Sequence, residues 1–156
     1  MGTEIERKFL LRGDGWRMEA DAGRSIRQFY LAAREGVSVR LRILDEREAR
    51  LTVKTGTGLS RGEYEYEVPL ADARAMESAR LGRVVEKRRH RVPLGSLTVE
   101  VDVFAGDLVP LVLAEIELLG ETHAFDRPAY LGREVTDDPR YANAALALAE
   151  RPPPAG

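Results

Sequence analysis

Residues 37–43 read Val-Ser-Val-Arg-Leu-Arg-Ile, so that Arg40 and Arg42 occupy one side of an extended chain and apolar residues occupy the other. Successive side chains of a β-strand point to opposite faces, and this period of two therefore predicts a strand with one charged and one apolar face. The same period recurs along most of the chain. The alternating runs predict eight strands, at residues 3–11, 24–33, 37–45, 47–55, 61–69, 83–92, 96–105 and 111–119.

Two segments depart from the period of two. Residues 70–81 are alanine-rich, carry apolar residues at helical spacing and precede Gly82, a typical C-cap, so they predict a helix. Asp138-Pro139 is typical of a helix start, with a carboxylate cap before a proline, and predicts a helix between Tyr141 and Glu150. The sequence thus predicts a mainly β fold with flanking helices, of the α+β class.

Short connections between neighbouring strands favour antiparallel pairing, and eight strands are enough to close a barrel. Residues 1–150 are expected to form one domain, and the proline-rich residues 151–156 are expected to be disordered. Tyr64 and Tyr66 alternate with the acids of their strand, so we expect them on the barrel exterior, packed under a helix.

The bulk composition limits the classes of partner. The 156 residues contain 24 Lys and Arg against 26 Asp and Glu, a balance that argues against a general nucleic-acid binder. The absence of cysteine excludes disulfides and thiolate metal sites. No apolar run is long enough to span a bilayer, so no membrane association is expected, and a cytoplasmic location is the simplest interpretation.

Charges of one sign are grouped on the predicted strands. Grouped like charges cost stability unless a partner of opposite sign resolves them. Pairs of carboxylates two residues apart offer the hard oxygen ligands that Mg²⁺ and Mn²⁺ prefer, and arginine and lysine suit phosphate. The pattern therefore predicts a site for divalent metal ions and a polyanion, although a solvated sheet face is the ordinary explanation for any one pair of acids.

The opening Glu4-Ile5-Glu6-Arg7-Lys8 resembles the E-x-E-x-K signature of the CYTH domain, also called the triphosphate tunnel metalloenzyme family. Two positions differ from the common pattern, with Ala129-Tyr130 where many members have a tryptophan and Ala142 where a serine is common. The resemblance extends along nearly the whole chain through Arg40-Leu41-Arg42, Lys54, Glu63 to Glu65, Lys87 to Arg89, Glu100 to Asp102, Glu115 to Glu117, and the closing residues 131–136 and 140–143.

This resemblance implies a closed eight-stranded antiparallel β-barrel with a charged tunnel, and hydrolysis of the terminal phosphoanhydride of inorganic triphosphate, with nucleoside triphosphates as further candidate substrates. It implies Mg²⁺ or Mn²⁺ as cofactor, with Lys8, Tyr30 and Lys87 near the reacting phosphate. The implied metal ligands are Glu4, Glu6, Glu100, Asp102, Glu115 and Glu117. The implied phosphate-binding residues are Lys8, Arg40, Arg42, Lys54, Arg61, Lys87 and Arg89, and Glu63 and Glu65 would line the tunnel.

Two other functions remain open from sequence. An adenylate cyclase of the same family would use the same metals to make cyclic AMP from ATP. A polyphosphate-binding module would keep the cations without metal chemistry, although such a binder gains nothing from so many carboxylates. The sequence leaves the oligomeric state open, with a homodimer among the options.

Overall fold

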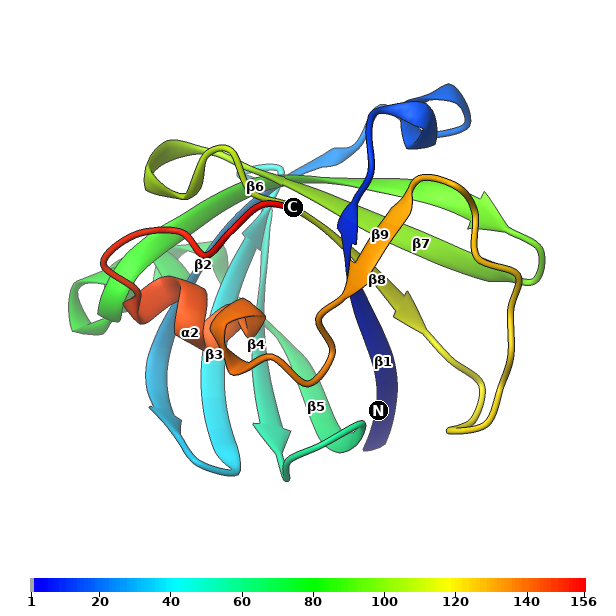
Figure 1. Ribbon diagram of the computed structural model, residues 1–156. Helices are drawn as coiled ribbons and strands as arrows, with labels where there is room; N and C mark the ends of the chain where they lie inside the picture. Colours follow the sequence, from blue (N-terminus) through cyan, green and yellow to red (C-terminus); the bar gives the residue numbers. More distant parts are fainter. Residues whose placement is uncertain (1) are drawn as a thin grey trace.

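A single antiparallel sheet closes on itself to form a barrel in the computed structural model, which describes residues 2–156 (Figure 1). The strand order is β5-β4-β3-β2-β6-β7-β8-β1, and pairing of β1 with β5 closes the ring. The predicted eight-stranded barrel is confirmed, with every predicted strand end within two residues of the observed one. The barrel strands are β1 (Gly2–Leu11), β2 (Arg24–Arg34), β3 (Val37–Leu44), β4 (Glu48–Thr55), β5 (Ser60–Val68), β6 (Leu81–Leu94), β7 (Leu97–Phe104) and β8 (Val112–Glu117).

A ninth strand, β9 (Leu131–Glu134), was missed by the sequence analysis. It pairs with the end of β1 outside the ring of eight strands. Three short 3₁₀ helices, η1 (Gly15–Met18), η3 (Gly106–Leu108) and η4 (Pro139–Tyr141), lie in the connections. The Asp138 side chain accepts a hydrogen bond from the Arg140 amide at 3.1 Å, as expected for a residue that starts a helical turn.

The helix predicted over residues 70–81 is shorter than expected. Helix α1 (Leu70–Met76) continues as the 3₁₀ turn η2 (Glu77–Ala79), and Leu81 already pairs with Tyr30 as part of β6. Gly82 is therefore inside a strand rather than a helix cap, although its φ of +63° is one that glycine adopts without strain. Helix α2 (Asn143–Leu148) follows η4 and lies against β2 and β6 (Figure 1).

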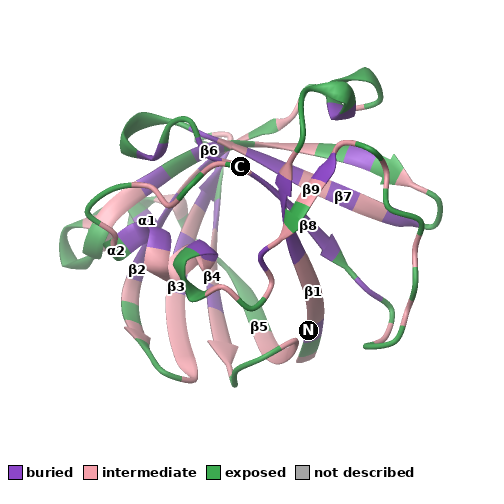
Figure 2. Cartoon of the chain, in the orientation of Figure 1, coloured by how far each residue is buried: buried purple, intermediate pink, exposed green. Residues whose placement is uncertain are grey.

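Apolar residues are buried mainly outside the barrel, because the inner face is charged. One cluster around Phe9, Trp16 and Ile116 covers the outer face of β1, β7 and β8. A second cluster around Phe29 and Leu41 packs under α1. Buried and half-buried positions alternate along β7 as far as Val101, as expected for a strand with one face in a core and one facing the lumen, and beyond it the lumen residues Asp102 and Phe104 are buried as well (Figure 2).

Two sequence-based expectations about the exterior need comment. Tyr64 and Tyr66 do lie on β5, but they are 38% and 54% exposed, so the expectation that a helix covers them is wrong. Residues 151–156, which the composition predicts to be disordered, are placed beside η4, where the Tyr141 hydroxyl donates a hydrogen bond to the Pro154 carbonyl at 2.5 Å. No helix within residues 2–156 is long and apolar enough to cross a membrane.

Candidate active site

The barrel encloses a cavity of about 200 Å³ whose lining is almost entirely charged. Every barrel strand except β2 contributes to it, because alternate residues of each strand point inward. The neighbouring Lys8, Lys87 and Asp102 are also buried. The lining residues are Glu4, Glu6, Arg40, Arg42, Arg50, Lys54, Glu63, Glu65, Arg89, Glu100, Glu115, Glu117 and, from α2, Asn143.

Asp102 is the buried counterion of two cations. Arg89 donates Nε and Nη2 to its two oxygens at 2.7 and 2.8 Å, and Lys87 Nζ lies 2.7 Å from Asp102 Oδ2. The Lys87 and Asp102 side chains are both 0% exposed. Burial lowers the pKa of Lys87 to about 7, against the opposing charge of Asp102. Burial alone would raise the pKa of Asp102, but the charges of Arg89 and Lys87 outweigh it and lower that pKa.

Arg40 and Arg42 are held side by side on β3. Gln28 Oε1 accepts from Arg42 Nε and Nη2 at 3.0 and 2.8 Å, which fixes the plane of that guanidinium. Burial lowers the pKa of Arg42 to about 9, and the nearby charge of Arg40 adds to the effect. The Nε of Arg40 is buried without a hydrogen-bond partner in the described chain. An unpaired buried donor is costly, so this atom indicates room for an acceptor such as a phosphate oxygen.

The carboxylates form two close pairs. Burial and a hydrogen bond with Glu63 raise the pKa of Glu4, while that hydrogen bond lowers the pKa of Glu63. Burial, reinforced by the charge of Glu115, raises the pKa of Glu6 to about 8. Burial would raise the pKa of Glu115 as well, but the charges of Lys8, Arg89 and Lys87 outweigh it and lower that pKa. Lys54 Nζ lies 2.9 Å from Glu4 Oε1 and 3.6 Å from Glu63 Oε2.

The acidic side of the cavity fits a divalent cation by donor type. Glu4, Glu6, Glu115 and Glu117 offer hard oxygen atoms to one cavity. Glu115 Oε1 lies 3.7 Å from Arg89 Nη2 and has no hydrogen-bond partner among residues 2–156. As the side chains stand, no three Asp, Glu or His residues among residues 2–156 converge closely enough to hold an ion. A bound cation would favour the ionised form of these carboxylates, Glu6 included.

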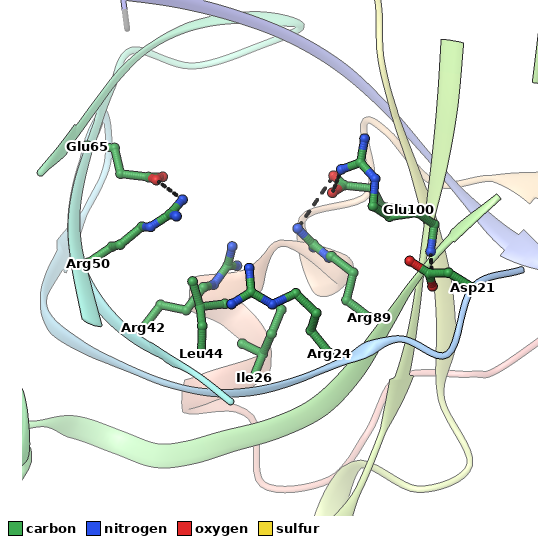
Figure 3. Close-up of a pocket in the computed structure, with 10 residues that line it drawn as sticks. Asp21, Arg24, Ile26, Arg42, Leu44, Arg50, Glu65, Arg89 and Glu100 are labelled. Atoms are coloured by element: carbon green, nitrogen blue, oxygen red, sulfur yellow. Dashed lines mark hydrogen bonds and ion pairs between the residues drawn. The ribbon is translucent and has the colours of Figure 1, made fainter. Parts of the chain in front are cut away.

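One end of the cavity opens through an arginine-rich mouth of about 210 Å³. Arg42, Arg50 and Arg89 line both the mouth and the cavity, so the two spaces are continuous. Figure 3 shows Arg24 and Arg42 over the apolar side chains of Ile26 and Leu44, with the Arg50–Glu65 ion pair opposite. A surface of this composition attracts polyanions and offers an apolar floor.

A second hollow, of about 260 Å³, reaches the cavity where β1 and β5 separate. These strands pair only as far as Ile5. Beyond it, the backbone of Lys8 is bonded to the segment after β9. The Lys8 carbonyl accepts from the Val135 amide at 2.8 Å, and the Lys8 amide donates to the Thr136 hydroxyl at 3.0 Å. Arg61 lines this hollow, lies 3.7 Å from Glu4 and 3.8 Å from Glu6, and has a buried Nε without a partner.

The structure brings most of the sequence-predicted residues to one cavity and places others beside it. Tyr30 is packed in an apolar cluster with Leu10 and Tyr141, and the Lys8 ammonium donates to the Tyr141 carbonyl at 3.0 Å. Asp102 has both oxygens engaged by cations. The roles of Tyr30 as a catalytic residue and of Asp102 as a metal ligand therefore stay predictions.

Three residues at the cavity were not singled out from the sequence. Arg50 could have been found by extending the period of two backwards from Lys54, and Gln28 by extending it backwards from Tyr30. Asn143 gave no signal, since it is uncharged and lies in a segment predicted only as a helix.

Comparison with known proteins agrees with this geometry. A family profile described as the CYTH domain matches residues 2–145. A protein of Acetivibrio thermocellus named inorganic triphosphatase is 45% identical over 148 residues, covering 94% of each chain. A protein of the same name from Nitrosomonas europaea is 44% identical over 153 residues, covering 94% of this chain and 97% of its own.

A crystal structure described as an inorganic triphosphatase is similar in fold, with a TM-score of 0.68 and 39% identity over 97% of this chain and 98% of its own. A structure from Pyrococcus horikoshii has a TM-score of 0.60 at 20% identity and shares the fold alone. The match therefore spans the whole barrel and its charged lining.

Proposed function

The chain belongs to the CYTH domain family, and on that premise we propose that it is an enzyme that hydrolyses inorganic triphosphate to phosphate and diphosphate. The observation that carries the proposal is the cavity itself, in which grouped cations and grouped carboxylates face each other. The relatives named inorganic triphosphatase, at 44–45% identity over almost the full chain, support it.

The basic residues would bind the substrate. Arg40 Nε and Arg61 Nε are buried donors without hydrogen-bond partners among residues 2–156, and they could donate to phosphate oxygens. Lys54 and Arg89 flank the same space, so the phosphate chain would exchange its water shell for fixed cations. Because phosphoryl transfer requires mainly positioning and neutralisation of charge, such a fixed set of cations stabilises the transition state for attack by water on the terminal phosphorus.

The acidic residues would hold the cofactor. We propose Mg²⁺ or Mn²⁺, held by Glu4, Glu6, Glu115 and Glu117, with Glu100 at the cavity edge. When bound, such an ion neutralises phosphate charge and lowers the pKa of the attacking water. Lys54 would release Glu4 as the cation enters and become free to donate to the substrate. Glu63 and Glu65 complete the lining from β5 and orient Lys54 and Arg50.

Lys87 and Lys8 would contact the terminal phosphoryl group at the inner end of the cavity. Burial lowers the pKa of Lys87, and the charge of a bound phosphoryl group would favour its ammonium form, as that of Asp102 does. Because Lys87 is buried, its protonation depends on the negative charge of the bound substrate.

A direct assay tests the proposal. Phosphate release is measured from inorganic triphosphate, ATP and diphosphate in parallel, with Mg²⁺, Mn²⁺ or EDTA. We expect metal-dependent release from inorganic triphosphate, and its loss in the Glu4→Gln and Glu117→Gln variants through weakened metal binding. Wild-type activity in both variants would refute the metal assignment, and tight triphosphate binding without turnover would indicate a binding module.

ATP is proposed as a second, slower substrate, because the partly exposed guanidinium groups of Arg24 and Arg50 line the mouth and can stack on a nucleobase. Cyclic AMP among the products of ATP would instead identify a cyclase. A cytoplasmic location is part of the proposal and is supported by the absence of cysteine from the 156 residues. The oligomeric state stays open and is measured by light scattering.

A further inference from the structure

The charged lumen stops abruptly at the end that faces α2. Two residues beyond Lys8, Lys87, Asp102 and Glu115, on the same strand faces, stand Leu10, Val85, Phe104 and Leu113. These apolar side chains form one buried cluster with Leu146 and Ala147 of α2. The barrel is therefore plugged along its axis at this end by packed hydrocarbon, and within residues 2–156 the cavity opens through the arginine-rich mouth and sideways through the hollow between β1 and β5.

Asn143 stands at the boundary between the charged and the plugged part. It is the only uncharged residue among those that line the cavity, and the only one that comes from outside the barrel strands. Its Oδ1 lies 3.4 Å from Lys87 Nζ. An ammonium group can only donate hydrogen bonds, so the Asn143 carbonyl oxygen must face Lys87, and its NH₂ group is left as a neutral donor.

Helix α2, which plugs the barrel, is fixed to the strands by several contacts. Arg83 donates Nη1 to the Leu146 carbonyl at 3.2 Å and Nη2 to the Ala149 carbonyl at 2.5 Å, which ties the last turn of α2 to β6. Gly82 allows close approach of the two elements, since a Cβ there would lie 2.2 Å from the Ala147 carbonyl oxygen. Lys8 is bonded to the Tyr141 carbonyl just before the helix. Asn143 is thus held in place from β1 and β6 together.

We propose that Asn143 is a specificity-determining residue which receives the terminal phosphoryl group at the plugged end of the tunnel, with the buried Lys87 behind it. This inference rests on the proposed function. Its consequence is a substrate class: the cavity accepts linear phosphate chains through a free end and excludes chains that have none. The terminal phosphoryl group carries the most charge of the chain, so it belongs at the end of the tunnel where Lys8 and Lys87 are 7% and 3% exposed.

The two possible roles of Asn143 are separated by its variants. Asn143→Asp keeps the size of the side chain and an acceptor for Lys87 but replaces the NH₂ donor with an anionic oxygen. If Asn143 contacts the phosphoryl group, triphosphate affinity falls by about 100-fold in Asn143→Asp and about tenfold in Asn143→Ala. If Asn143 only supports Lys87, Asn143→Ala has no further effect on triphosphate affinity in a Lys87→Met background, which would overturn the proposal.

Binding is measured by calorimetry with inorganic triphosphate in EDTA, so that turnover plays no part, and KM is measured separately with Mg²⁺. Leu148→Asp is the matched control, because it adds the same charge to α2 at a side chain that is 53% exposed and does not line the cavity. It is expected to bind as the wild type does. Loss of affinity in Leu148→Asp equal to that in Asn143→Asp would also overturn the proposal, because the effect would then not depend on the cavity.

Cyclic trimetaphosphate tests the closed end directly, since it has three phosphates and no terminal phosphoryl group. In competition against labelled linear triphosphate, we expect the inhibition constant of trimetaphosphate to be at least 100-fold higher than that of unlabelled linear triphosphate. Similar inhibition constants would show that no free end is needed. Triphosphate hydrolysis by the wild type with unchanged affinity in the Asn143 variants would refute this inference alone. Absence of both binding and hydrolysis in the wild type would refute the proposed function with it.

Discussion

Asp102→Asn is expected to destabilise the protein strongly in the absence of any metal. Asp102 is 0% exposed and accepts three short contacts from Lys87 and Arg89, at 2.7, 2.7 and 2.8 Å. The amide keeps the shape but removes the charge and turns an NH₂ group towards one of the two cations. Removing one partner of a buried ion pair costs about 3–5 kcal/mol, because the other charge is left buried without compensation. For a chain of this length each kcal/mol lowers Tm by about 2–4 °C, which predicts a fall of roughly 6–20 °C.

The measurement is urea and thermal unfolding followed by circular dichroism in EDTA at neutral pH. Glu48→Gln serves as the control, since Glu48 pairs with Arg24 at 2.9 Å while both side chains are nearly half exposed, and its loss is expected to cost less than about 1 kcal/mol. If Asp102 acts instead as a metal ligand without a structural role, the variant unfolds in EDTA like the wild type and only its metal affinity falls. A difference below about 0.5 kcal/mol would refute our assignment of Asp102 as an internal counterion.

Three further outcomes are expected. The pKa of Glu6 is raised from 4.5 to about 8, so the stability that its protonation contributes is complete below about pH 4.5 and is lost as pH rises through 8. Glu6→Gln mimics the protonated form. In EDTA its free energy of unfolding should match that of the wild type at pH 5 and exceed it at pH 9. Gly82→Ala should lower the free energy of unfolding in urea by about 2 kcal/mol more than Gly95→Ala does. Both glycines have positive φ, but of the two only Gly82 has backbone atoms within 4 Å of an added Cβ. Equal losses would show that α2 moves away freely. Phe9→Ala should cost about 3–5 kcal/mol in the same assay, because Phe9 is 0% exposed on the apolar outer face of β1, and a loss below 1 kcal/mol would contradict the placement of that core.

Most barrel strands could be predicted because the charged lumen imposes a period of two on them, whereas β2 contributes no residue to the charged cavity and shows a weaker alternation. β9 could not, since Leu131–Glu134 is only four residues long and shows no alternation. The end of α1 was missed because pairing of Leu81 with Tyr30 in the sheet overrides the helical preference of its alanine-rich segment.

The candidate site could be predicted as a set of charges but not as a set of pairs. The period of two and the charges identify Lys87, Arg89 and Asp102 as lumen residues. Nothing in the sequence indicates that both oxygens of Asp102 are paired with these two cations. The same holds for Asn143, whose position depends on how α2 seats against the barrel. Which charges pair, and which residues plug the barrel, depend on how the strands close into a ring and how α2 packs on it. A periodic pattern within one strand carries no information about either.

The placement of apolar clusters on the outer faces of the barrel bears on how such a protein can change over evolution. Since Phe9, Phe29 and Leu41 hold the scaffold from outside, a lumen residue can be exchanged without opening a void in a folding core. The constraint on the lumen is electroneutrality, so an acid and its facing base must vary together, as Lys54 with Glu4 or Arg89 with Asp102. New selectivity in this architecture is therefore expected to arise through epistatic double substitutions, in which each single step is worse than either end point.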